Sequence, residues 1–216
     1  MCKLLYSQNG MRLTSIAIHG RPAATSHSVQ SGFARGVRMG PVAAMHKARQ
    51  LLEGYSSLPK VLVLDLDYTV WPYWCEMYSP SDRPPGLYPE ASAIIDACRE
   101  RKVIIAAASR TPTPDVARAF MHKLGLDVKF DNIQLIPAAN GYDSCSAQKD
   151  TCHLPNIREA TGWGYASMLF FDDEMGNVAK VARLGVCSVQ VPTSIGLCLK
   201  TFSEGLDKFA AQQQAQ

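Results

Sequence analysis

The chain has 216 residues, a length that suits one ordinary domain with a sizeable core. Its hydrophobic content of 47% is typical of a globular protein, and no apolar run approaches the roughly 18 residues that a membrane span requires. Residues 1–52 hold seven of the 22 basic side chains and none of the 19 acidic ones, so the remainder is acidic overall despite the net charge of +3. Charge therefore gives no support to nucleic-acid binding.

The N-terminal segment is rich in arginine, serine, threonine and alanine, and it lacks the apolar core of a secretory signal. We interpret residues 1–55 as an organelle transit peptide or a disordered extension, with translation starting at Met39 or Met45 as a further alternative. A transit peptide would direct the chain to a chloroplast or a mitochondrion. Without one, we expect a cytoplasmic protein.

The cysteines are seven in number, are scattered and form no Cys-x-x-Cys pair. This usage indicates reduced thiols in an intracellular compartment. Cys145, Cys152 and His153 are the one set that could suggest zinc ligands. Because their spacing is irregular and a fourth ligand is missing, a plain loop is the favoured interpretation.

From residue 60 onward, strand and helix patterns alternate along the chain. Apolar runs predict strands at Lys60–Leu66, Val103–Ala108, Asn132–Ile136, Ser167–Phe171 and Cys187–Val191. Helical spacing predicts helices at Pro89–Arg101, Thr113–Leu124, Asn156–Ala160, Met175–Leu184 and Leu197–Phe209. We therefore expect an α/β fold, Rossmann-like and three-layered (α/β/α), with a mainly parallel five-stranded sheet. The domain should span residues 56–210, followed by a disordered tail at 211–216.

The first predicted strand ends in two carboxylates, Asp65 and Asp67. Burying an unpaired carboxylate is very costly, so something must neutralise them, and a divalent cation is the obvious candidate. Ligands of α/β sheets bind at such strand ends. One aspartate can hold a metal and attack an electrophile while a second serves as acid and base. This division of roles suits phosphoryl transfer through an aspartyl-phosphate.

The segment Asp65–Val70 resembles the first motif of the haloacid dehalogenase (HAD) superfamily, whose members are mostly phosphatases. A narrower resemblance, to the magnesium-dependent phosphatase 1 family, covers about Lys60 to Phe209. It rests on four blocks in order, namely Asp67–Trp74, Leu87–Glu90, Ala106–Thr111 and Phe170–Glu174. The connection between Trp74 and Tyr88 is too short for the cap domain that the superfamily often inserts there, so we expect no large cap.

The resemblance implies a magnesium ion, Mg²⁺, as cofactor and assigns roles to four aspartates. Asp65 is the nucleophile and a metal ligand. Asp67 is the general acid and base, and its backbone carbonyl helps to hold the metal. Of the pair Asp172 and Asp173, one ligates magnesium directly and the other acts through water or a hydrogen bond. Asp173 is the favoured direct ligand, with Asp172 as the alternative.

The resemblance also implies residues that bind the phosphoryl group. The Ser109 hydroxyl donates to it, Arg110 pairs with phosphate or with a substrate carboxylate, and Leu66 contributes from within the first motif. Lys149 is the third-motif lysine that offsets negative charge, although the stretch 144–153 carries one residue more than the family pattern. The alternative interpretations are that Ser109 is a helix-capping serine, that Arg110 is a solvated arginine and that Lys149 is an ordinary surface lysine. We expect Lys149→Ala to slow turnover with little effect on the melting temperature.

Aromatic residues crowd the loop after the first strand. Trp74 is the candidate for stacking on a substrate ring or sugar face. Trp71 and Tyr73 are interpreted as packing residues beneath the loop, because buried aromatics usually pack.

These features favour a capless, magnesium-dependent phosphomonoesterase. By resemblance its substrates are phosphotyrosine-type compounds and sugar phosphates, including glycation products, so its partners are small phosphorylated metabolites or phosphotyrosine proteins. We expect a monomer without nucleic-acid or membrane partners. The alternatives are a phospho-aspartate switch of the receiver type, where the adjacent acidic pair follows the first strand, and a non-catalytic binding module on a phosphatase fold. A dehalogenase is disfavoured because that branch lacks the second aspartate.

Overall fold

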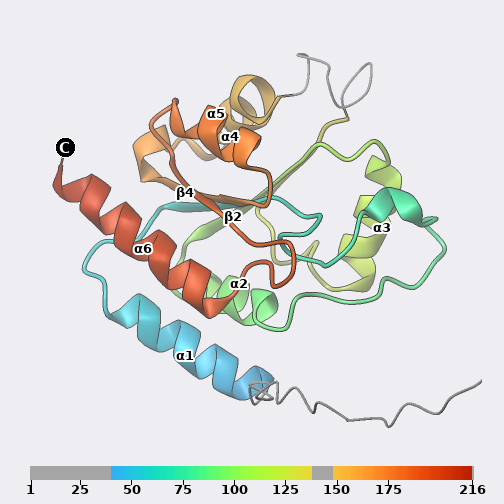
Figure 1. Cartoon of the computed structure of the whole chain (residues 1–216), viewed down its shortest axis with the longest axis horizontal. Helices are drawn as coiled ribbons and strands as arrows, with labels where there is room; N and C mark the ends of the chain where they lie inside the picture. The colour runs from blue at the N-terminus through green and yellow to red at the C-terminus, as the bar shows by residue number, and fades with distance from the viewer. Residues whose placement is uncertain (1–39, 138–147, 216) are drawn as a thin grey trace, which may run out of the picture. The chain divides into compact units, whose positions relative to one another are not determined.

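One parallel sheet organises the fold. The computed structural model describes residues 40–137 and 148–215. Its strands are β1 (Val61–Leu64), β2 (Ile104–Ser109), β3 (Asn132–Leu135), β4 (Met168–Asp172) and β5 (Cys187–Gln190) (Figure 1). They lie in the order β3-β2-β1-β4-β5, and every neighbouring pair is parallel. The predicted five-stranded α/β fold is confirmed, with strand bounds within two residues of those expected.

The helices connect these strands and cover the sheet. They are α1 (Pro41–Glu53), α2 (Ala91–Glu100), α3 (Pro114–Lys123), α4 (Leu154–Thr161), α5 (Met175–Ala182) and α6 (Leu199–Gln214). Gly162 ends α4 with φ of 73°, a left-handed conformation that glycine adopts without steric cost. Gly162 therefore indicates the end of α4 in the sequence, because this left-handed conformation favours glycine.

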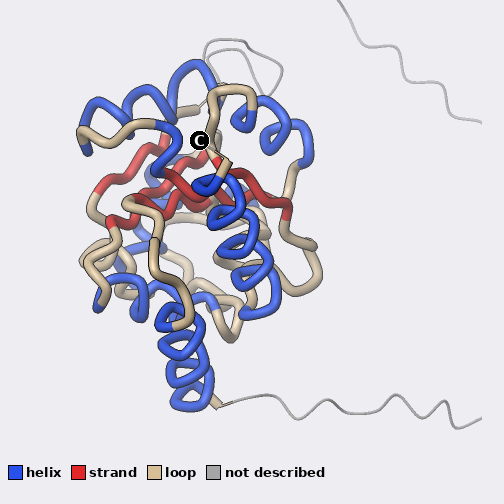
Figure 2. The backbone as a smooth tube through the Cα atoms, turned by 90° about the vertical axis from the view of Figure 1, so that its left-hand side faces the viewer, coloured by secondary structure: helices blue, strands red, loops and turns tan. Residues whose placement is uncertain are grey.

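The two faces of the sheet carry separate cores, which makes the fold three-layered (Figure 2). Leu62 and Leu64 of β1 face a large cluster that includes buried residues of α1, α2, α3 and α6. Val61 and Val63 face a smaller cluster with residues of α4 and α5. Because helices cover both faces, a central strand must be apolar at every position, as β1 is.

The register brings the carboxyl ends of three strands together. Leu64 pairs with Ala107 of β2 and with Phe171 of β4, and the Asp65 amide donates to the Phe171 carbonyl at 3.0 Å. β1 lies between β2 and β4, which is where the strand order reverses. Such a reversal opens a crevice at the carboxyl edge of the sheet. The residues that follow these three strands are thereby placed around one crevice.

Both predicted ends of the domain need correction. α1 begins at Pro41, inside the segment expected to be an extension, and Ala48 and Leu52 are fully buried in the large core cluster. An expected start at residue 56 is therefore too late. At the other end α6 continues to Gln214, so most of the expected tail at 211–216 is helical.

The connection between β1 and α2 builds no cap domain. Residues 74–88 hold one short 3₁₀ turn, Cys75–Met77, and otherwise irregular backbone. The Lys123 ammonium donates to the carbonyls of Pro80 and Asp82 at 2.6 Å each, which ties this connection to α3. Within the described residues, no helix is both long and apolar enough to cross a membrane.

Candidate active site

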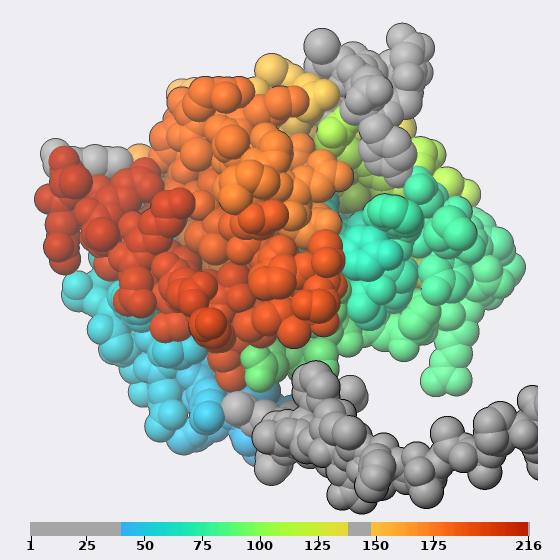
Figure 3. Space-filling view, in the orientation of Figure 1, coloured from blue at the N-terminus to red at the C-terminus, as the bar shows by residue number. Residues whose placement is uncertain are grey.

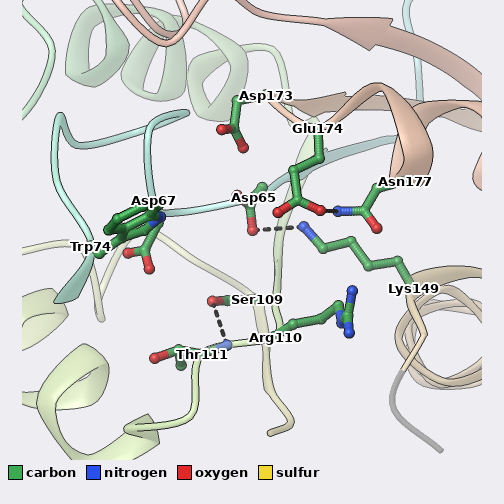
Figure 4. A pocket seen from close by; sticks show the side chains of 10 residues that line it. All are labelled: Asp65, Asp67, Trp74, Ser109, Arg110, Thr111, Lys149, Asp173, Glu174 and Asn177. Carbon is green, nitrogen blue, oxygen red and sulfur yellow. Dashed lines mark hydrogen bonds and ion pairs between the residues drawn. The ribbon is translucent and has the colours of Figure 1, made fainter. Parts of the chain in front are cut away.

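A pocket lies at the carboxyl edge of the sheet, where the segment after β1 (teal) meets the segment around β4 and α5 (orange) in Figure 3. Most of its lining residues are polar or charged (Figure 4). They are Asp65, Asp67, Trp74, Ser109, Arg110, Thr111, Lys149, Asp173, Glu174 and Asn177. The structure thus brings together nearly all of the residues singled out in the sequence.

Lys149 lies at the centre of the charged groups. Its ammonium contacts Asp65 Oδ1 at 2.7 Å and also contacts Asp172 Oδ2. Only 2% of Lys149 is exposed, so it is not an ordinary surface lysine. It belongs to a π-helical turn, Lys149–His153, that leads into α4. A π-helical turn accommodates an extra residue and is frequent at functional sites, which fits the extra residue in this part of the sequence.

The environment shifts the pKa values of three aspartates and of the lysine in this site. Burial raises the pKa of Asp65 well above its usual range, although the Lys149 charge opposes the shift. Burial also raises the pKa of Asp67. For Asp173, burial and the nearby Asp172 charge raise the pKa to about 6. Burial lowers the pKa of Lys149, but the two carboxylates outweigh burial and the pKa is raised overall.

Asp172 is held by several donors. The Glu174 amide donates to Oδ1 at 2.8 Å, and Asn177 Nδ2 lies 3.2 and 3.3 Å from the two carboxylate oxygens. Asn177 Nδ2 also contacts Glu174 Oε2 at 3.0 Å. With Lys149 on Oδ2, Asp172 is fully buried and saturated with hydrogen bonds, whereas Asp173 is partly exposed and faces the pocket.

Asp67 approaches the pocket from the turn after β1. Its Oδ1 accepts the indole N–H of Trp71 at 2.5 Å and the backbone N–H of Cys75 at 3.3 Å. Tyr68, the next residue, has φ of 53°, in the left-handed region that non-glycine residues rarely adopt. Such strained residues cluster at active sites, where the surrounding structure holds them in place.

Ser109 ends β2 and is 98% buried, with its hydroxyl 3.4 Å from the Thr111 amide. The Ser109 carbonyl lies 2.9 Å from His153 Nε2, and burial lowers the pKa of His153 to about 4. A neutral His153 therefore donates to this carbonyl and links the Lys149 turn to β2. Arg110 follows at the pocket wall.

The other residues considered in the sequence analysis differ in whether their side chains reach the pocket. Trp74 is 53% exposed at the pocket, and its ring meets the Tyr68 ring edge-on at 5.4 Å. The Leu66 side chain is fully buried in the core, so any contact of Leu66 with a substrate must come from its backbone. Trp71 and Tyr73 are buried and their rings stack at 5.6 Å, in agreement with a packing role.

Comparison with known proteins assigns the family. A family model described as Acid Phosphatase matches residues 81–212. The chain is 31% identical over 170 residues to magnesium-dependent phosphatase 1 of Homo sapiens, covering 72% of this chain and 90% of the human protein. The chain belongs to the HAD superfamily and, within it, to the magnesium-dependent phosphatase 1 family. It is a magnesium-dependent phosphatase of the HAD type.

Two further comparisons concern a second relative in sequence and a solved structure with a similar fold. The chain is 32% identical over 146 residues to a HAD-like hydrolase superfamily protein of Schizosaccharomyces pombe, covering 59% of this chain and 83% of that protein. A solved HAD-superfamily hydrolase from Ehrlichia chaffeensis superposes with a TM-score of 0.51 at 11% identity, covering 72% of this chain and 99% of that chain. The last comparison concerns the fold alone.

The pocket fits the Mg²⁺ cofactor of a magnesium-dependent phosphatase. Carboxylate oxygens of Asp65, Asp172 and Asp173 lie within 4.8 Å of one another, and magnesium prefers such oxygen ligands. In the described part of the chain this is the one group of at least three histidine, cysteine or acidic residues close enough to share a metal. The set of cysteines and histidine considered for zinc is not among them, and Cys145 lies outside the described residues.

Glu174 and Thr111 line the pocket but were assigned no role from the sequence. Glu174 and Thr111 both stand in the blocks that resemble the family, yet neither follows a strand directly. Glu174 is the third acidic residue in a row, in a run that begins at the last residue of β4, and that run was the signal available in the sequence. Thr111 is oriented by local hydrogen bonds, which no sequence pattern reveals.

Proposed function

We propose that this phosphatase works through an aspartyl-phosphate on Asp65. The observation that carries the proposal is the orientation of this carboxylate at the end of β1. Lys149 contacts Oδ1 at 2.7 Å, while Oδ2 has no hydrogen-bond partner among the described residues. Oδ2 is therefore the oxygen available to attack phosphorus, and Lys149 balances the charge that remains.

The other pocket residues supply the remaining steps. Asp67, whose raised pKa favours the protonated carboxyl, protonates the leaving oxygen and then takes a proton from the water that hydrolyses the aspartyl-phosphate. Ser109 and Arg110 bind the phosphoryl oxygens. Asp65 and Asp173, with the Asp67 carbonyl, would hold magnesium. Asp172 would not ligate the metal directly, because its carboxylate oxygens already accept hydrogen bonds from Asn177 and Lys149. Bound magnesium supplies positive charge beside the transferred phosphoryl group.

A chemical trap tests the nucleophile. The enzyme is mixed with a labelled phosphate ester, quenched in acid within one turnover and treated with hydroxylamine, which cleaves acyl phosphates. We expect protein-bound label that hydroxylamine releases, no label in Asp65→Asn, and normal labelling in Asp115→Asn, which changes an exposed carboxylate of α3. Label that persists in Asp65→Asn would place the nucleophile elsewhere.

We further propose phosphotyrosine-type compounds and sugar phosphates as substrates. The support is an open pocket without a cap and a half-exposed Trp74 at its edge, where a ring or sugar face can stack. Trp74→Ala should raise KM for a phosphotyrosine peptide about 3- to 10-fold. The KM for a small alkyl phosphate should stay unchanged. Equal effects on both substrates would remove the support for ring stacking.

The acid-free N-terminal segment supports a proposed transit peptide. Because α1 belongs to the folded part, the targeting segment should end before Pro41. Residues 1–39 fused to a fluorescent protein should enter a chloroplast or a mitochondrion. A diffuse cytosolic signal would count against targeting.

A further inference from the structure

The carboxylate of Asp67 is held asymmetrically. Oδ1 accepts two N–H donors, the Trp71 indole at 2.5 Å and the Cys75 backbone at 3.3 Å. The hydrogen-bond contact of Oδ2 within the described residues is a long one, to the Cys75 thiol at 3.8 Å. Both nitrogens are donors only and have no lone pair to offer a carboxyl proton. A proton on this carboxyl is therefore excluded from Oδ1 and belongs on Oδ2.

The indole of Trp71 is itself fixed. Its side chain is fully buried, and its ring is parallel to that of Tyr73 within 1°. The Trp71 amide donates to the Leu66 carbonyl at 3.2 Å, and Asp67 and Trp71 form an isolated β-bridge. Trp71 and Asp67 are therefore connected by backbone contacts as well as by their side-chain hydrogen bond. A donor held this firmly determines the orientation of the carboxylate that it contacts.

We propose that Trp71 is a positioning residue for catalysis, which holds Oδ1 of Asp67 so that Oδ2 exchanges the proton with substrate. The inference rests on the proposed acid–base role of Asp67. In the first step Asp65 Oδ2 forms a bond to phosphorus as the phosphorus–oxygen bond to the leaving group breaks, and the leaving oxygen takes the proton from Asp67 Oδ2. In the second step water forms a bond to phosphorus, the bond between phosphorus and Asp65 breaks, and Asp67 Oδ2 takes the proton that the water loses.

A packing role alone makes a different prediction. If Trp71 only fills space, Trp71→Phe should act on stability and reduce activity equally for all substrates. If its N–H orients the acid, the loss should depend on how much the leaving group needs a proton. An alkyl phosphate releases a strongly basic oxygen, whereas a nitrophenyl phosphate releases a weakly basic one. The two substrates therefore separate the roles.

The experiment measures kcat/KM for both substrates on each purified variant, with magnesium present. Its readout is the ratio of the alkyl to the nitrophenyl value, which does not depend on the fraction of folded enzyme. We expect this ratio to fall about 10- to 100-fold in Trp71→Phe, the size of effect that slight misplacement of a catalytic group produces. Tyr73→Phe is the matched control, because the buried Tyr73 hydroxyl has no hydrogen-bond partner within the described residues. Its ratio should equal that of the wild type.

The variant Asp67→Asn tests the acid–base role of Asp67 separately from the positioning role of Trp71. If Asp67→Asn keeps the wild-type ratio, Asp67 is not the acid and the proposed mechanism fails. If Asp67→Asn lowers the ratio but Trp71→Phe does not, only the inference about Trp71 is overturned. We expect both to lower it, and the double variant to lower it no further than Asp67→Asn alone, because Trp71 acts through Asp67.

Discussion

At the scale of single residues, Lys149 supplies the positive charge that compensates two buried carboxylates. Its ammonium contacts Asp65 and Asp172, of which Asp172 is fully buried. Removing one partner of a buried ion pair typically costs about 3–5 kcal/mol, because the other charge remains without compensation. We therefore expect Lys149→Met to lower the stability of the metal-free protein by about that amount, measured by urea unfolding. The expectation that substitution of Lys149 spares the melting temperature is replaced, because the structure buries this lysine between two carboxylates.

Two comparisons check the cause of that loss. Asp172→Asn in the Lys149→Met background should restore part of the stability, since it removes one unpaired charge. Lys200→Met, which changes an 83% exposed lysine, should stay within about 0.5 kcal/mol of the wild type. A Lys149→Met protein as stable as Lys200→Met would show that the carboxylates do not require this cation.

Asp173 gives a residue-scale prediction for pH and metal. Its pKa in the folded, metal-free protein is about 6, above the ordinary value of 3.8. The folded state therefore binds this proton more tightly than the unfolded state, and stability falls as pH rises through this window from about 4 to about 6. Asp173→Asn should raise the melting temperature in EDTA at pH 7.5, with a smaller gain at pH 4.5. It should also lose the rise that magnesium gives the wild type.

The matched control is Glu159→Gln on the exposed surface of α4. It should leave the melting temperature in EDTA and the rise with magnesium unchanged. If Asp173→Asn were less stable than the wild type in EDTA at pH 7.5, the carboxylate would not be under electrostatic strain. If it kept the full rise with magnesium, Asp173 would not be a ligand.

At the scale of elements, Gly205 sets how closely α6 approaches the sheet. A Cβ built on Gly205 would lie 2.5 Å from Cζ of Phe171 in β4, closer than real contacts allow. We expect Gly205→Ala to destabilise the protein by about 1–3 kcal/mol through overpacking, measured by urea unfolding. Gly176 in α5 has nothing within 4 Å of its Cβ position, so Gly176→Ala should follow helix propensity and stabilise by up to about 1 kcal/mol. Equal effects of both substitutions would show that α6 can shift away from Phe171.

The elements also show what the sequence could predict. Apolar runs that end in Asp65, Ser109 or Asp172 located the strands and, with them, the carboxyl edge where the pocket forms. The turn that buries Lys149 is π-helical, and its geometry depends on tertiary contacts rather than on a local pattern. The hydrogen-bond donors to Asp67 could not be predicted from the sequence either. A buried tryptophan is interpreted as a packing residue whether or not its indole N–H has an acceptor.

α1 was missed for a different reason. Its buried residues Ala44, Ala48 and Leu52 repeat every four positions, but alanine buries little surface and gives a weak apolar stripe. Pro41 at the first turn and Gly54 at the end were the stronger signals, since proline and glycine mark helix ends in that order. The acid-free composition of the surrounding segment obscured them.

At the scale of the whole molecule, α1 makes the boundary of the folded unit testable. Arg49 pairs with Glu100 of α2 through two hydrogen bonds of 2.7 and 2.6 Å, and Leu52 is fully buried. Exposed ion pairs contribute little, so Leu52 and its neighbours carry most of the contact energy. A chain starting at residue 40 should keep the melting temperature and turnover of the full chain. A chain starting at residue 54 should lose stability by at least the roughly 2–5 kcal/mol typical of deleting one buried leucine.

Leu52→Ala in the full chain is the matched single-residue test of α1. It should lower stability by about 2–5 kcal/mol, while Val42→Ala, at an 84% exposed position of the same helix, should change it little. Because α1 packs on α2 and α6 and contributes no residue to the pocket, the loss should affect stability before turnover. Leu52→Ala at low temperature should therefore keep a normal kcat. A chain starting at residue 54 that is as stable as the full chain would return the boundary to residue 56, where the sequence alone had placed it.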